Sequence, residues 1–195
     1  MPFTIEANFY CHYKIGDNVN YNLEILDSLY SMLGENQARS YLLYKNIIII
    51  NVSIIEAVLA DFYSRIKKHT YEGVPNITEA FTELVQKKKI SDFTKYINYA
   101  RDNNVFGQNP DIYDQLIHLQ AVRNRVHIQD LERHREHQKK LSRNDRSVFT
   151  DNNLKRSEKS LEFIIKMLNK FHPREDNKSS DYVNEHDFPW EPYFK

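Results

Sequence analysis

The feature that most restricts the fold of this chain is a long apolar segment between residues 36 and 68. Its apolar residues cover nearly the whole circumference of a helix, which is typical of a helix buried on most sides. These residues are Tyr41, Leu42, Ile47, Ile48, Ile50, Val52, Ile54, Ile55, Val58, Leu59, Phe62 and Ile66. Asn51, Ser53, Glu56 and Asp61 interrupt the run, so we interpret it as the central helix of a bundle and not as a membrane span.

The rest of the chain also predicts helices. Glycine and proline together number only ten in 195 residues, which argues against many short strands and turns. Apolar residues recur at helical spacing in the remaining segments, with Ser91 and either Thr150 or Asp151 as N-caps. The expected helices run from 17 to 33, 36 to 68, 78 to 88, 91 to 103, 110 to beyond 126, and 150 to 171. We therefore predict an all-α fold, an up-and-down bundle of five to six helices.

The pattern divides the chain into one bundle and a tail. Residues 1–172 form the predicted domain, with an N-terminal arm at 1–16 that is extended or a loop. Residues 129–149 are mostly polar and either extend a helix into solvent or form a mobile loop. The segment 173–195 is an acidic tail that ends in aromatic residues. These aromatic residues pack either on the bundle itself or on a partner protomer.

Charge and cysteine content limit the function classes. The formal net charge is zero, so no global field attracts nucleic acid. Residues 121–146, however, hold eight Lys or Arg against four acids. This segment is either a solvated helix face or a basic strip that binds a polyanion such as RNA. The candidate RNA contacts are Arg125, Arg133, Arg135, Lys139 and Lys140. With Cys11 as the single cysteine and no signal-peptide pattern, the sequence indicates a cytoplasmic protein.

One short segment carries the residues most suited to chemistry. Arg123 and His127 are four residues apart at the end of the pattern that begins near Pro110. On an α-helix they would share one face, about 6 Å apart along the axis. A guanidinium can bind a phosphate and an imidazole can move a proton near neutral pH. The alternative is an ordinary helical pair that caps nearby carbonyls or carboxylates.

The segment Leu119-Gln120-Ala121-Val122-Arg123-Asn124-Arg125-Val126-His127-Ile128 resembles the signature helix of the HEPN superfamily. The central helix, with Glu56 inside the run Ile54-Ile55-Glu56-Ala57-Val58-Leu59, is also similar to these domains. The resemblance covers about residues 20–172. Members of the superfamily are often metal-independent endoribonucleases that act as dimers, and others are inactive RNA-binding or assembly domains.

The resemblance implies roles for particular residues. It assigns catalysis to Arg123 and His127, with Asn124 beside the arginine, and it implies no cofactor and no metal. Glu56 needs a partner in a buried helix; it either anchors Arg123 or His127 or forms a plain structural ion pair. The implied function is a bacterial toxin or phage-defence ribonuclease, a homodimer that acts on RNA and has an antitoxin or other protein partner.

Three alternatives remain beside the ribonuclease. Three residues separate Arg123 from His127, a shorter spacing than the family's usual one, and this favours a catalytically inactive module that binds RNA or protein. A purely structural helical domain is another interpretation. A metal site at His134, Glu136 and His137, with His127 upstream, is the third alternative. Solvated histidines are the favoured interpretation of these residues in so polar a segment.

Overall fold

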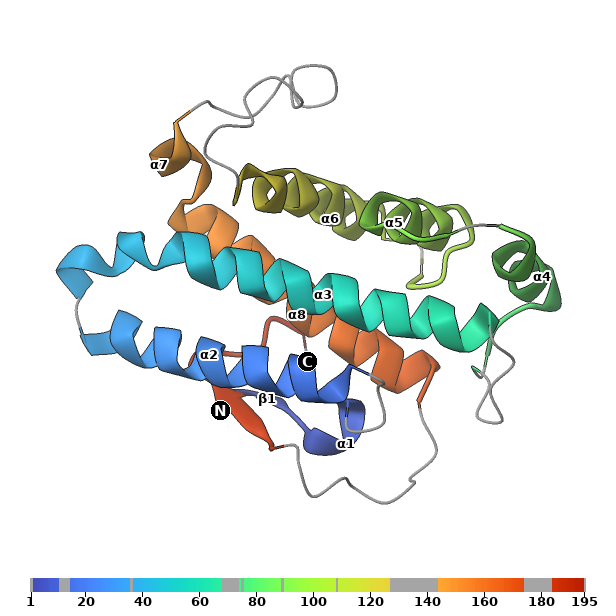
Figure 1. Ribbon diagram of the computed structural model, residues 1–195, viewed down its shortest axis with the longest axis horizontal. Helices are drawn as coiled ribbons and strands as arrows, with labels where there is room; N and C mark the ends of the chain where they lie inside the picture. The colour runs from blue at the N-terminus through green and yellow to red at the C-terminus, as the bar shows by residue number, and fades with distance from the viewer. Residues whose placement is uncertain are drawn as a thin grey trace.

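The structure, a computed structural model, is an all-α helical bundle (Figure 1). It confirms the fold class predicted from the sequence. Among the described residues, six helices are nine residues or longer, in agreement with the five to six expected. The structure describes residues 2–10, 15–35, 37–67, 74, 76–88, 90–107, 109–126, 144–173 and 184–194.

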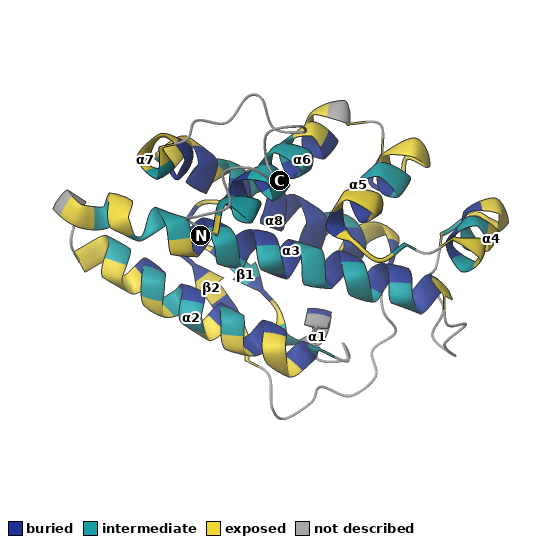
Figure 2. Ribbon diagram, turned by 45° about the horizontal axis from the view of Figure 1, so that its top comes forward, coloured by how far each residue is buried: buried dark blue, intermediate teal, exposed yellow. Residues whose placement is uncertain are grey.

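Helix α3 (Tyr44–Lys67) is the central helix, as its apolar pattern predicts. It packs against α2 (Gly16–Glu35) and α8 (Asp151–Phe171). It also packs against α4 (Glu79–Lys87), α5 (Phe93–Asp102) and α6 (Pro110–Arg123). By length and composition alone α3 could cross a membrane, but its place among these helices is that of the core of a bundle, where Ile47, Ile55 and Phe62 are completely buried. Figure 2 shows the buried residues gathered on the inner faces of the helices.

The predicted helix at 36–68 is wrong at its beginning. A 3-10 helix, η1 (Gln37–Leu42), precedes α3 and is separated from it by one turn residue. Tyr41 and Leu42, which the pattern placed among the buried apolar residues, are about half exposed. The Leu43 N–H donates to the Ser40 carbonyl, a tighter i to i+3 bond.

Three further helices cover one side of α3. They are α4 (Glu79–Lys87), α5 (Phe93–Asp102) and α6 (Pro110–Arg123), and α6 continues as a 3-10 helix, η2 (Asn124–Val126). Figure 1 places α5 and α6 side by side above α3, with α4 beyond the end of α5. The predicted N-cap Ser91 is wrong by one residue, because the Asp92 carboxylate accepts the Lys95 backbone N–H at 3.0 Å. Thr150 is confirmed as the N-cap of α8.

The N-terminal arm and the tail meet in a small sheet that the sequence does not predict. Strand β1 (Phe3–Ile5) pairs antiparallel with β2 (His186–Phe188), with Phe3 opposite Phe188. The short helix α1 (Ala7–Tyr10) follows β1. Phe188 stacks on Trp190 at 4.9 Å between ring centroids, and Tyr30 of α2 lies 5.2 Å from Trp190. Of the two positions left open for the tail, this structure shows docking on the chain's own bundle.

Two buried glutamates of α8 fasten the end of the tail. Glu162 accepts the backbone N–H groups of Tyr193 and Phe194 at 2.9 and 2.8 Å, and it pairs with Lys166 at 3.0 Å. Glu158 accepts the hydroxyls of Tyr30 and Tyr193 at 2.9 and 3.1 Å. Burial raises the pKa of Glu158, and the two hydroxyl bonds oppose that rise.

Candidate functional site at the end of helix α6

Arg123 is the last residue of α6, and its guanidinium forms an ion pair with the Glu56 carboxylate in the middle of α3. Its Nη1 also lies 3.5 Å from Oδ1 of Asn124, at the limit of a hydrogen bond. The two paired side chains remain 30% and 26% exposed. The guanidinium has five N–H groups, and those not used here have no partner among the described residues. They are available to an anion from solvent.

The ion pair decides part of the choice that the sequence left open. Glu56 was expected to contact Arg123 or His127, or to be a structural pair, and it contacts Arg123. A single carboxylate fixes the direction of the guanidinium without covering it. A partly exposed ion pair contributes little to stability. This pair is therefore compatible with a positioned phosphate ligand as well as with a plain packing role.

Arg125 lies in a second ion-pair cluster, on the other side of η2. Its Nη2 is 3.5 Å from Asp145 at the start of α7 (Asp145–Val148), and Lys45 of α3 is 2.8 Å from the same carboxylate. The Arg125 side chain is only 11% exposed. Arg125 therefore contacts a carboxylate of the bundle in this structure, and its contact with RNA stays a prediction.

The backbone at the motif differs from the continuous α-helix expected from the sequence. The α-helix ends at Arg123, and residues 124–126 follow a 3-10 path with three residues per turn. The Asn124 N–H closes the α-helix by donating to the Gln120 and Val122 carbonyls. The predicted pairing of Arg123 with His127 assumes α-helical spacing, and that spacing ends at Arg123. His127 itself lies outside the described residues.

Other predicted residues are also outside the described part of the chain. They are the candidate RNA contacts Arg133, Arg135, Lys139 and Lys140, and the metal alternative His134, Glu136 and His137. Within the ranges that the structure does describe, no group of three or more His, Cys, Asp or Glu side chains is arranged to hold a metal ion.

Sequence reasoning missed the residues that hold the motif from other elements. The sequence analysis did not identify Lys45 and Asp145, which form an ion pair. It also did not identify the hydrogen bond that Gln120 donates to the Thr94 hydroxyl of α5 at 2.6 Å. These contacts join positions distant in the chain, and no local pattern indicates them. His118 of α6 was also missed; it lies 2.9 Å from Asn153 and borders an open groove of about 520 Å³ between α6 and α8.

The chain matches no protein-family model, no characterised protein and no solved structure. The superfamily resemblance therefore stays a prediction made from the motif.

Proposed function

We propose that this protein is a metal-independent endoribonuclease that cleaves RNA by attack of the ribose 2′-hydroxyl, with Arg123 and His127 as its catalytic residues. The observation that carries the proposal is the Arg123–Glu56 pair. It presents an oriented, partly exposed guanidinium in the sequence segment that resembles the HEPN signature. Asn124, next to that guanidinium, supports its position.

The proposed reaction is a transesterification that needs no metal. His127 takes the proton of the 2′-hydroxyl, whose oxygen attacks the adjacent phosphorus, and the bond to the 5′-oxygen breaks. The 5′-oxygen receives a proton as it leaves, so the products are a 2′,3′-cyclic phosphate and a 5′-hydroxyl. Arg123 binds the phosphoryl oxygens, where its planar fork offers two N–H groups to the charge that builds there.

One His127 per chain supplies either the base or the acid. A homodimer would supply both, so we propose a symmetric dimer in the cytoplasm, with a role in toxin or phage-defence systems and an antitoxin or other protein partner. Arg123 and Glu56 together carry no net charge, so long-range attraction of RNA is assigned to the basic residues of 121–146.

The second candidate is a catalytically inactive module that binds RNA or a protein. The 3-10 path at 124–126 favours it, because the α-helical spacing that would place Arg123 and His127 on one face ends at Arg123. The ion pair of Arg125 with Asp145 favours it too, since the carboxylate offsets the charge of one cation of the basic segment.

Cleavage of total RNA in the presence of EDTA tests the proposal. We expect wild-type protein to leave 2′,3′-cyclic phosphate ends and both His127→Ala and Arg123→Ala to lose cleavage by at least about a hundredfold. Arg101→Ala, at an exposed position of α5, is the matched control for Arg123→Ala and should cleave like wild type. Cleavage that persists in His127→Ala would sink the catalytic assignment, and RNA binding without cleavage in wild type would favour the inactive module.

A further inference from the structure

A pocket of about 340 Å³ lies between α3, α4 and α5, beyond the Arg123–Glu56 pair. Ala60 and Tyr63 of α3, Val85 of α4 and Ile90 before α5 supply apolar walls. This volume and this lining are those of a pocket for one small organic group. Neither the sequence analysis nor the proposed reaction uses it.

Three residues with hydroxyl groups, Ser64, Ser91 and Tyr96, also line this pocket. Among the described residues, none of the three hydroxyls has a hydrogen-bond partner. Lys67, which is exposed, stands at its edge. A ligand that fits must therefore offer apolar faces to the walls and hydrogen-bonding atoms along its edge.

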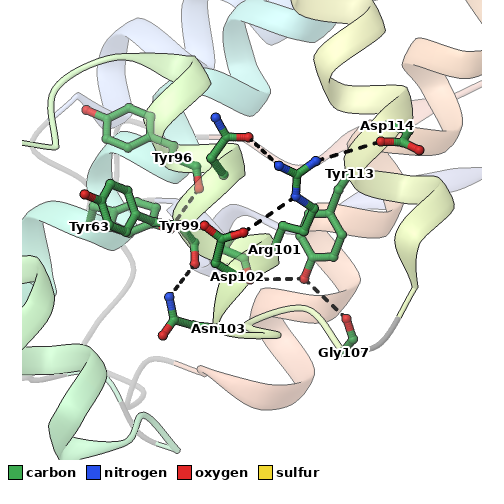
Figure 3. A network of polar contacts seen from close by, with 11 residues as sticks. Tyr63, Tyr96, Tyr99, Arg101, Asp102, Asn103, Gly107, Tyr113 and Asp114 are labelled. Atoms are coloured by element: carbon green, nitrogen blue, oxygen red, sulfur yellow. Dashed lines mark hydrogen bonds and ion pairs between the residues drawn. The ribbon is translucent and has the colours of Figure 1, made fainter.

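The aromatic side of the pocket is held rigidly. The rings of Tyr63 and Tyr96 stack with centroids 5.1 Å apart and planes 17° apart, and the Tyr63 hydroxyl donates to the Tyr96 carbonyl at 2.8 Å (Figure 3). Burial, followed by the charges of Glu56 and Asp92, raises the pKa of Tyr96. The phenol therefore stays neutral at physiological pH and can both donate and accept a hydrogen bond.

The pocket and the proposed site share helix α3. Ala60 lies one turn after Glu56 on the same face of the helix, about 6 Å along the axis. The Gln120–Thr94 hydrogen bond ties α6 to the first turn of α5, two residues before Tyr96.

We infer that this pocket receives one unstacked nucleobase of a single-stranded RNA whose neighbouring phosphate is bound at Arg123. The inference rests on the proposed function and adds its substrate class. A nucleobase has apolar faces for Ala60, Val85 and Ile90, and its edge offers donors and acceptors to the hydroxyls. Single-stranded RNA is recognised in this way, by splayed bases held in apolar or aromatic pockets.

The experiment measures binding of fluorescein-labelled 2′-fluoro RNA oligonucleotides, which lack the attacking hydroxyl, by fluorescence anisotropy. The probes are homopolymers of each base and an abasic strand of equal length. The proteins are wild type, Ser64→Leu to fill the pocket, Tyr96→Phe to remove only its hydroxyl, and Arg123→Ala. Ser28→Leu, the same substitution on an exposed position of α2, is the matched control.

We expect wild type and Ser28→Leu to bind one homopolymer about tenfold more tightly than the abasic strand, the scale of one bound base. Ser64→Leu should lose that difference, and Tyr96→Phe should change the preferred base while its circular dichroism stays that of wild type. Unchanged base preference in Ser64→Leu and Tyr96→Phe, with weaker binding in Arg123→Ala, would overturn the pocket and leave the proposed function standing. Absence of RNA binding and cleavage in wild type would overturn both.

Discussion

Two acid clusters in this molecule have opposite surroundings. On α8, the Glu162 side chain is fully buried and Glu158 is 6% exposed, and both accept hydrogen bonds from the tail. At the end of α6, Glu56 and Asp145 are 26% and 41% exposed, and each binds an arginine. A buried carboxylate with several donors is committed to the fold, because losing them leaves it desolvated and unpaired. A half-exposed pair keeps part of its hydrogen-bonding capacity for a ligand.

The largest expected effect breaks the buried cluster. Glu162→Ala leaves two backbone N–H groups and Lys166 without their acceptor, so we expect the free energy of unfolding to fall by about 3 kcal/mol. Urea denaturation measures it, and emission of the single tryptophan, Trp190, should shift to longer wavelength as the tail leaves the core. Glu83→Ala, an exposed partner of Lys87, is the control and should change stability by under about 0.5 kcal/mol. An unchanged urea midpoint in Glu162→Ala would contradict the buried role.

Removal of one hydroxyl from the same cluster should cost less. Tyr30→Phe keeps the ring against Trp190 but takes a donor from Glu158 and an acceptor from Asn51, which lies 3.4 Å away. We expect a loss of about 1.5 kcal/mol, typical of a buried hydrogen bond whose partner stays behind. Tyr21→Phe, at a largely exposed position of α2, should be neutral in the same denaturation assay. Equal stability of the two variants would refute the distinction.

The raised pKa of Glu158 gives the buried cluster a pH dependence. Burial favours the protonated form of Glu158 in the folded state. The protonated side chain therefore stabilises the fold fully at pH values below 4.5, the ordinary pKa of a glutamate. This stabilisation is lost as the pH rises through the raised pKa of Glu158. We therefore expect wild-type stability to decline relative to Glu158→Gln as pH increases from 4.5. Urea midpoints measured at successive pH values check it. Parallel curves for the two proteins would show that burial does not govern this carboxyl.

The smallest expected change in stability lies at the exposed cluster. A double-mutant cycle of Glu56→Gln and Arg123→Ala should give a coupling energy of under about 1 kcal/mol. In the cleavage assay, Glu56→Gln alone should lower the rate about tenfold or more, because the guanidinium loses its fixed direction. A coupling of several kcal/mol with unchanged cleavage would instead make this pair structural, like the pairs of α8.

The sequence predicted the elements whose pattern is local. The apolar run of α3 and the spacing of α8 specify both long helices, and Thr150 was recognisable as an N-cap because a capping hydroxyl acts within three residues. Strands β1 and β2 were not recognisable. Each has three residues, too few for an alternation to be distinguished, and the paired residues lie 181 to 185 positions apart in the chain.

The candidate site was predictable only in part, for the same physical reason. Glu56 stood out because a charged residue in an apolar helix needs a partner, and Arg123 was one of the two partners considered. The Arg125–Asp145 contact depends on how α7 meets η2, which no spacing in the sequence encodes. The α-helix ends at Arg123 and a 3-10 path follows at 124–126, whereas the prediction extended the α-helix beyond Val126.

The pairing of β1 with β2 also fixes how the molecule responds to mechanical load. Because the strands are antiparallel and Phe3 faces Phe188, the chain enters β1 and leaves β2 at the same end of the ladder. A force that separates these two points acts along the hydrogen bonds and breaks them in succession. Of the backbone bonds at this end of the ladder, the Phe3 N–H bond to the Trp190 carbonyl, at 3.1 Å, lies nearest the two points. Tension across the ends should thus first pull Tyr193 and Phe194 from Glu162 and then unzip the sheet, while α3 and α8 are still packed.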